Sequence, residues 1–362
     1  MAENEKIVFD CVPTYLKGFH DDILASKMVY SKLGQTQLLV SRLGLGGAQL
    51  KDVLNTPKEQ DGIDTVIKAV KSGINYFDTA PYYGQGKAET MLGKALKLIP
   101  RNTYYLATKV GRYGVNEETA ERFDFSAMRT LQSVKESFAR LGVNHIDLLQ
   151  IHDVEFCPDV NIIINETLPA LQSLKDAGKI SYIGITGYPL SKLREIVEKS
   201  KVKIDTVLSY CRCTLLDNEL RKYIPFFQER RLGIINAAVL GMGLLTNNSN
   251  LPEWHPAFPN IKQICKQAAD YCKERDVNLA RLAANYSFSQ PDIHVHLIGM
   301  ESEKLVQANL SSLYDPLTAH ETEVLNHIIE NFYRKIPVTN WENIEPQAYW
   351  QDLKTLDLQK LQ

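Results

Sequence analysis

Short apolar runs alternate along the chain with longer stretches in which apolar residues recur three and four positions apart. The short runs are rich in β-branched residues and favour strands, whereas the longer stretches have the period of helices that bury one face. The predicted strands span 43–46, 74–79, 104–109, 146–152, 180–186, 206–210, 233–239 and 295–300. The clearest predicted helices span 63–71, 88–98, 127–141, 167–176, 191–198, 219–228 and 261–275.

Eight strands, most of them followed by a helix, predict an α/β fold of the (β/α)₈ barrel type, the TIM barrel. The strands are almost continuously apolar, as expected for a parallel sheet that helices cover. A doubly wound sheet that binds a dinucleotide is the alternative. That fold needs a glycine-rich turn after its first strand, and the candidate at 44–49 lacks the third glycine. The barrel is therefore the better prediction.

The chain extends beyond the predicted barrel at both ends. Two apolar runs around Gly-Gln-Thr-Gln predict a short hairpin just before the first barrel strand. We expect an N-terminal extension (1–27), the hairpin and barrel (28–330) and a C-terminal tail (331–362).

Composition narrows the function classes. The net charge is −2 without a basic cluster, so nucleic-acid binding is not expected. No apolar run has membrane-spanning length, and the first ten residues lack the apolar segment of a secretory signal. The six cysteines form no CxxC motif, and we place Cys211 and Cys213 on one face of a strand, poorly oriented for a disulfide. We expect a soluble, cytoplasmic monomer or weak homo-oligomer that acts on a small molecule.

Polar residues collect at the C-terminal ends of three successive predicted strands, where barrel active sites lie. Asp78, Lys109 and His152 each stand at such an end, and Tyr83 follows Asp78 in the next loop. Each alone is more often a structural residue, such as a helix cap or a hydrogen-bonded histidine. Their coincidence at one rim favours a catalytic site.

These four side chains suit reversible carbonyl reduction. A free phenol has a pKa near ~10, and a neighbouring ammonium such as Lys109 is expected to lower it. Asp78 would hold that ammonium, and His152 would donate a hydrogen bond to the substrate oxygen. Tyr83 is then the general acid in reduction and the general base in oxidation.

The constellation and the motif Asp-Thr-Ala-x-x-Tyr-Gly at 78–84 resemble the aldo-keto reductases, and the likeness runs from about 28 to about 310. The resemblance implies a nicotinamide-dependent oxidoreductase that acts on a CH–OH or carbonyl group. The segments 73–84, 205–211 and 243–257 are most similar to sugar dehydrogenases of the family. They imply oxidation of an aldose, such as L-galactose, at C1 to its lactone.

The resemblance also implies a set of binding residues. Only part of the family's usual set of contacts to the nicotinamide carboxamide is present. Thr186 and Gly187 stand where the family usually has Ser and Asn, and Val207 replaces a usual Gln. The residues expected to contact the cofactor are Thr186, Gly187, Tyr210, Leu240, Gly241, Gly243, Leu245, Gly299, Glu301, Ser302, Leu305 and Asn309. Tyr82 and Trp254 are expected to contact the substrate.

The segment 299–305 predicts the coenzyme. Cations that hold a 2′-phosphate in relatives align with Gly299 and Leu305, and Glu301 lies between them. A carboxylate accepts hydrogen bonds from ribose hydroxyls and repels a phosphate, so we predict NAD in preference to NADP. The alternative role of Glu301 is to cap the next helix, and Lys304 is the remaining cation in reach of a phosphate.

Three alternative functions stay open. One is an NAD(P)H-dependent reductase of aldehydes or ketones, and another is a regulatory barrel that binds the cofactor without turnover. The third is a metal enzyme built on His294, His296, His152 and Asp153. Two histidines two positions apart share a strand face, but no third ligand follows at a recognisable spacing. We therefore expect no metal.

Overall fold

The computed structural model describes residues 8–114, 122–248 and 251–360, and its centre is a closed barrel of eight parallel strands. The strands are β3 (Leu43–Gly46), β4 (Tyr76–Asp78), β5 (Tyr105–Val110), β6 (Ile146–Ile151), β7 (Ile180–Gly187), β8 (Thr206–Tyr210), β9 (Gly233–Ala237) and β10 (Val295–Gly299). They pair in chain order, and β10 closes the barrel between β9 and β3. The predicted (β/α)₈ barrel is confirmed.

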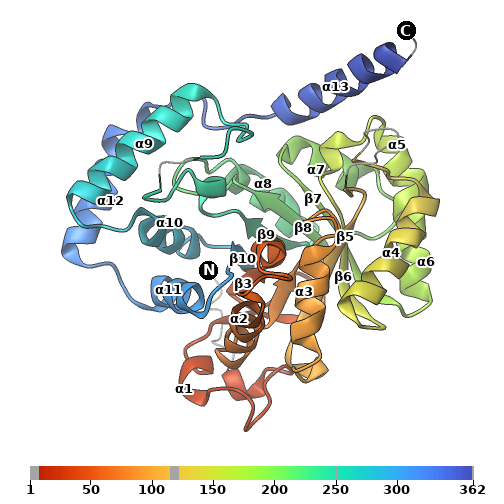
Figure 1. Cartoon of the computed structure of the whole chain (residues 1–362), viewed down its shortest axis with the longest axis horizontal. Helices are drawn as coiled ribbons and strands as arrows, with labels where there is room; N and C mark the ends of the chain where they lie inside the picture. The colour runs from red at the N-terminus through yellow and green to blue at the C-terminus, as the bar shows by residue number, and fades with distance from the viewer. Residues whose placement is uncertain (1–7, 115–121, 249–250, 361–362) are drawn as a thin grey trace.

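Helices surround the strands (Figure 1). The helices that follow barrel strands are α2 (Glu59–Lys71), α3 (Lys87–Leu96), α4 (Ala127–Leu141), α6 (Leu168–Asp176), α7 (Leu190–Lys199), α8 (Leu220–Glu229) and α11 (Glu303–Tyr314). The other helices are α1 (Asp22–Ala25), α5 (Val160–Ile162), α9 (Pro259–Glu274), α10 (Leu279–Phe288), α12 (Ala319–Asn331) and α13 (Ile344–Lys360). No helix within the described ranges is long and apolar enough to span a membrane.

A hairpin closes the end of the barrel where the strands begin. Its strands are β1 (Tyr30–Lys32) and β2 (Leu39–Ser41). Leu33, Leu38 and Val40 are buried in one cluster with residues near the starts of the barrel strands. The predicted hairpin thus exists, and its apolar side fills the bottom of the barrel.

The N-terminal extension packs beside this hairpin, although its residues 1–7 lie outside the described ranges. The Nδ2 group of Asn75 donates to Thr14 Oγ1 at 2.8 Å, and Tyr30 donates to the Gly73 carbonyl at 2.9 Å. These bonds connect the extension and the hairpin to the turn that leads into β4.

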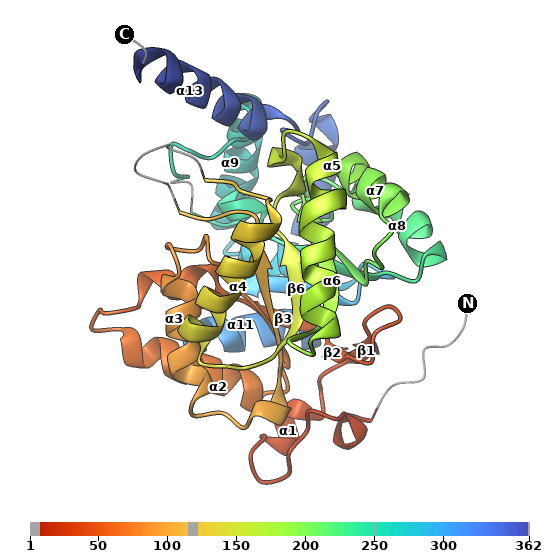
Figure 2. The ribbon, with the colours of Figure 1, turned by 90° about the vertical axis from the view of Figure 1, so that its right-hand side faces the viewer.

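The C-terminal tail lies at the other end, near the ends of β7 and β8. Trp341 is 2% exposed and stacks on Tyr188, with 5.0 Å between ring centroids. In Figure 2, α13 lies at one extreme of the molecule and the α1 segment at the opposite one.

One local prediction is wrong. Strand β8 ends at Tyr210, and Cys211 takes a left-handed backbone conformation with φ of 60°. Cys211 and Cys213 therefore lie in the loop after the strand rather than on one strand face. Both are free thiols, and burial raises their pKa, Cys211 above the ordinary thiol range and Cys213 to about 12.

Candidate active site

Lys109 is the centre of a polar cluster at the C-terminal end of the barrel. Its ammonium pairs with Asp78 and donates to the Thr79 carbonyl at 2.9 Å and to the Tyr83 hydroxyl at 3.2 Å. The ring of His152 meets that of Tyr83 edge-on, with 5.7 Å between the centroids. The structure therefore brings together all four residues that the sequence predicted as catalytic.

Strand register explains this convergence. Asp78 lies opposite Ala107, and Lys109 lies opposite Gln150, in the parallel pairs β4–β5 and β5–β6. Alternate residues of a strand face the barrel interior, so Gln150 and His152 both point inward from consecutive inward positions. Gln150 donates to Asp78 Oδ2 at 2.7 Å, whereas Lys109 pairs with Oδ1, so both oxygens of the carboxylate are held. Gln150 was not among the predicted site residues, although its two-residue spacing from His152 is a usable signal.

The protonation state of Tyr83 differs from the prediction. Burial raises its pKa above the usual 10.0, and Asp78 and Asp153 add to the rise, whereas Lys109 lowers it. Lys109 therefore acts in the expected direction, but burial and the carboxylates outweigh it in the free protein. The pKa of Lys109 itself is lowered by burial, but Asp78 and Tyr83 raise it to a value above the usual 10.5. The site combines a neutral phenol with a cationic lysine.

His152 is neutral. Burial lowers its pKa well below 6.5, and the cations Lys109 and Arg112 lower it further. A neutral imidazole carries one N–H, so it donates one hydrogen bond and adds no positive charge. This state fits a residue that orients a substrate oxygen while the proton moves through Tyr83.

A second ion pair adjoins the catalytic cluster, and the sequence analysis did not predict it. Arg112, two residues after β5, pairs through Nη1 with Asp153 Oδ2, and the same oxygen lies 3.6 Å from His152 Nε2. The guanidinium lies over the Tyr82 ring at 3.8 Å. Tyr82, which the sequence predicted as a substrate contact, packs edge-on against His152 at 6.1 Å.

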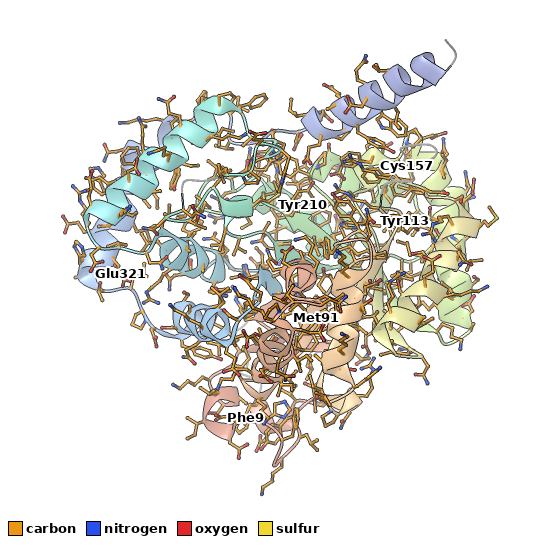
Figure 3. All side chains as sticks on the ribbon, in the orientation of Figure 1. Phe9, Met91, Tyr113, Cys157, Tyr210 and Glu321 are labelled. Atoms are coloured by element: carbon orange, nitrogen blue, oxygen red, sulfur yellow. The ribbon has the colours of Figure 1, made fainter. Side chains whose placement is uncertain are left out.

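Thr186 and Gly187, which align with the residues that hold the nicotinamide carboxamide in the family, contact other residues of this protein. Thr186 Oγ1 accepts a hydrogen bond from the Asp153 amide at 3.1 Å. A Cβ at Gly187 would lie 2.7 Å from Glu155 Oε2, so this carboxylate takes up the space beside the glycine. Tyr210, labelled near the middle of the view in Figure 3, donates to Glu155 Oε1 at 3.4 Å. Burial and Asp153 raise the pKa of Glu155 to about 8.

The loop after β9 has a backbone that suits close approach of a ligand. Gly241 and Gly243 have φ values of 60° and 109°, which favour glycine. Leu240 and Leu305 of α11 both pack against one hydrophobic cluster. Leu245 is buried and anchors the loop.

The start of α11 lies directly after β10, which ends in Gly299. Ser302 caps the helix by accepting the Leu305 amide at 3.4 Å. Glu301 is therefore not the cap. A capped helix N-terminus at the strand end is a common phosphate site, so the region fits the pyrophosphate and adenosine part of a dinucleotide. Asn309 is buried two turns after the cap.

Two further sequence hypotheses concern Trp254 and a metal site. Trp254 is 70% exposed and stacks on His255 with 6.2 Å between ring centroids, and its contact with the substrate stays a prediction. The histidines of the metal hypothesis have other roles, because His294 accepts the Ile234 amide at 3.1 Å and His296 contacts Asn236 Nδ2 at 3.3 Å. No cluster of three or more potential metal ligands occurs among the described residues.

Comparisons with known proteins place this geometry in a family. The model of the aldo/keto reductase family matches residues 42–330. L-galactose dehydrogenase of Arabidopsis thaliana is 39% identical and aligns over 84% of this chain and 97% of its own. D-arabinose 1-dehydrogenase of Saccharomyces cerevisiae is 33% identical, over 87% of this chain and 98% of its own.

Solved structures of other proteins are similar to this fold. An aldo-keto reductase from Bacillus halodurans, in its holo form, is 29% identical with a TM-score of 0.65, covering 83% of this chain and 96% of its own. Such enzymes move a hydride between a nicotinamide cofactor and a small molecule. The chain belongs to the aldo/keto reductase family and is a nicotinamide-dependent oxidoreductase.

Proposed function

We propose that this protein oxidises an aldose at C1 to its lactone and uses NAD in preference to NADP. The observation that carries the proposal is the Tyr83 hydroxyl, which lies 3.2 Å from Lys109 Nζ and beside a neutral histidine. The substrate class is supported by the relatives, three of which are named as dehydrogenases of L-galactose, D-arabinose and D-threo-aldoses.

Each residue of the cluster has a separate task in this proposal. Nicotinamide, when bound, supplies the hydride acceptor. Tyr83 receives the proton of the C1 hydroxyl, and Lys109 stabilises the phenolate that makes this possible. His152 donates a hydrogen bond to the same substrate oxygen. Asp78, held by Gln150, keeps Lys109 charged and aimed at Tyr83.

The coenzyme preference rests on Glu301. This side chain is half-buried, and it makes no hydrogen bond or ion pair with any described residue because Ser302 serves as the cap of α11. A carboxylate with this freedom at the start of the helix is available for ribose hydroxyls and disfavours a 2′-phosphate. Lys304, the nearby cation, is exposed.

The test is an absorbance assay of the purified protein with NAD and with NADP against a panel of aldoses, including L-galactose and D-arabinose. We expect reduction of NAD with at least one aldose and formation of a lactone. Reduction of aldehydes without oxidation of any aldose would replace the proposal with a carbonyl reductase. Cofactor binding without any turnover would indicate a regulatory barrel.

A further inference from the structure

We propose that Arg112 and Asp153 together recognise the hydroxyl group on the carbon next to the reacting carbon. They would make the enzyme specific for polyhydroxylated substrates. The proposal deepens the proposed function and rests on it.

The position of the pair supports this role. Asp153 directly follows His152, and its Oδ2 lies 3.6 Å from the imidazole Nε2. Arg112 lies over the ring of Tyr82. The centroid of that ring lies 6.3 Å from the Tyr83 ring centroid and 6.1 Å from that of His152. Adjacent oxygens of a diol are about one hydrogen-bond length apart. A substrate oxygen held by Tyr83 and His152 therefore has its neighbouring hydroxyl within reach of the pair.

The pair has hydrogen-bonding capacity left over. Arg112 donates to Asp153 through Nη1, and neither its Nη2 nor its buried Nε has a hydrogen-bond partner among the described residues. Asp153 Oδ2 receives that bond, whereas Oδ1 accepts none from the described part of the chain. A hydroxyl both donates and accepts, so it can accept from Nη2 and donate to Oδ1 at once. An aldehyde without a neighbouring hydroxyl leaves both groups unpaired, which is costly at a buried site.

The surroundings fix the pair in place. The guanidinium is enclosed by three aromatic rings, those of Tyr82, Phe123 and Phe156, at 3.8, 5.2 and 5.5 Å. Such stacking orients the planar fork of an arginine and leaves its edge for hydrogen bonds. Asp153 has a φ of 50°, in the left-handed region that few residues besides glycine adopt, although Asp is among the residues that tolerate it. Residues held in this way are preorganised for a ligand rather than for solvent.

The experiment compares substrates that differ by one hydroxyl. The kcat/KM of the wild type, Arg112→Lys and Asp153→Asn is measured with an aldose and with its 2-deoxy analogue. We expect the wild type to prefer the parent sugar by about 100-fold or more, since a site built for a hydroxyl rejects analogues that lack it. Each variant should lose most of that preference, through a raised KM for the parent sugar, and change little toward the deoxy sugar.

A control arginine separates recognition from stability. Arg129 lies over the Tyr113 ring at 4.0 Å and pairs with Glu136, and it forms no ion pair with Asp153 or Asp78. Arg129→Lys should leave the preference for the parent sugar unchanged. Equal losses on both sugars in the Arg112 and Asp153 variants would show a merely structural pair and overturn the inference.

The reverse reaction separates this inference from the proposed function. If no aldose is oxidised, the same variants are tested for reduction of glyceraldehyde and of propanal, which lacks the neighbouring hydroxyl. A preference for glyceraldehyde that Arg112→Lys abolishes would support the pair while the proposed function fails. Equal reduction of the two aldehydes by the wild type would contradict the inference itself.

Discussion

Tyr83 is the residue whose hydroxyl is expected to move the proton, so its loss should be visible in turnover alone. Tyr83→Phe keeps the ring that packs on His152 and removes the group that Lys109 contacts at 3.2 Å. We expect kcat to fall by about 10²–10⁴-fold, the usual value of a positioned proton carrier. Steady-state kinetics measure this, with a cofactor titration to show unchanged binding.

Tyr82→Phe is the matched control, since its ring stays over Arg112 and against His152. It should keep turnover close to that of the wild type. A Tyr83→Phe enzyme with normal kcat, when chemistry limits the rate, would refute the role of Tyr83.

The raised pKa of Tyr83 predicts a pH dependence. Burial places this pKa above the usual 10.0, and oxidation needs the deprotonated form, which becomes more abundant as pH rises toward the pKa. We expect kcat/KM for oxidation to rise roughly tenfold per unit between about pH 7 and pH 9. Because the pKa of His152 lies well below 6.5, this histidine should add no ionisation in this range, whereas Glu155, whose pKa burial raises to about 8, titrates within it.

Replacing Lys109 tests the cause of this dependence. Lys109→Met removes the charge that lowers the pKa of Tyr83. The increase of kcat/KM with pH should therefore move to still higher pH, and activity should be lower at every pH. A bell-shaped profile centred near neutrality would contradict this assignment of protonation states.

At the scale of single residues, the sequence predicted the catalytic cluster because strand ends are visible in the hydrophobic pattern. Asp78, Lys109 and His152 are all end residues of predicted strands. Arg112 could not be predicted in the same way. Its role depends on the aromatic rings that enclose it and on an ion pair with Asp153 of another loop, and neither is visible in the sequence. The protonation of Tyr83 also depends on the degree of burial, which a sequence pattern does not supply.

At the scale of elements, helix α11 is expected to set the coenzyme preference. The double variant Glu301→Lys with Leu305→Arg replaces one repulsive carboxylate by two cations. We expect the ratio of Kd values for NAD and NADP to shift toward NADP by about 100-fold or more, since each charge-assisted hydrogen bond contributes about 1.5–3 kcal/mol. Direct fluorescence titration of both cofactors measures it.

Ser302 provides the control for this helix. Ser302→Ala removes the cap that accepts the Leu305 amide, so it should lower stability by about 1 kcal/mol without reversing the coenzyme preference. A wild type that binds NADP more tightly than NAD would refute the role of Glu301.

The hairpin is an element with a role in stability and none in catalysis. Leu33 is fully buried at the bottom of the barrel, so Leu33→Ala should lower the free energy of unfolding by about 2–5 kcal/mol. Urea denaturation measures the loss, and kcat/KM should stay unchanged because the catalytic cluster lies at the other end. Leu98→Ala, at a residue 61% exposed, is the control and should change stability by less than about 0.5 kcal/mol.

The barrel elements were predictable because each buries a short apolar strand or an amphipathic helix face. The predicted helical spans did not include α10, α11, α12, α13 or the short α1 and α5. Helix α10 is buried along much of its length, so its apolar residues show no single stripe. Burial along α13 depends on neighbours distant in sequence, such as Phe123, which contacts Tyr349 at 5.1 Å.

At the scale of the whole molecule, the C-terminal tail is tied to the catalytic end of the barrel. Trp341 stacks on Tyr188, and its backbone amide donates to the Tyr188 hydroxyl at 3.2 Å. Nearby, Arg212 pairs with Asp217 at 3.1 Å and with Glu342 of the tail at 2.8 Å. The pairs and the stack join the tail to the loops after β7 and β8, so tail and barrel should unfold together.

Trp341→Ala tests that connection. Truncating a buried tryptophan costs about 3–5 kcal/mol, so the urea midpoint should fall while unfolding remains a single transition. Trp341→Phe should recover most of the stability, because the ring stack survives and the indole Nε1 has no partner among the described residues. Trp254→Ala, at the exposed tryptophan, should change stability by less than about 0.5 kcal/mol. An unchanged midpoint for Trp341→Ala would mean that the tail contributes nothing to the folded barrel, against the contacts of Tyr188 and Arg212.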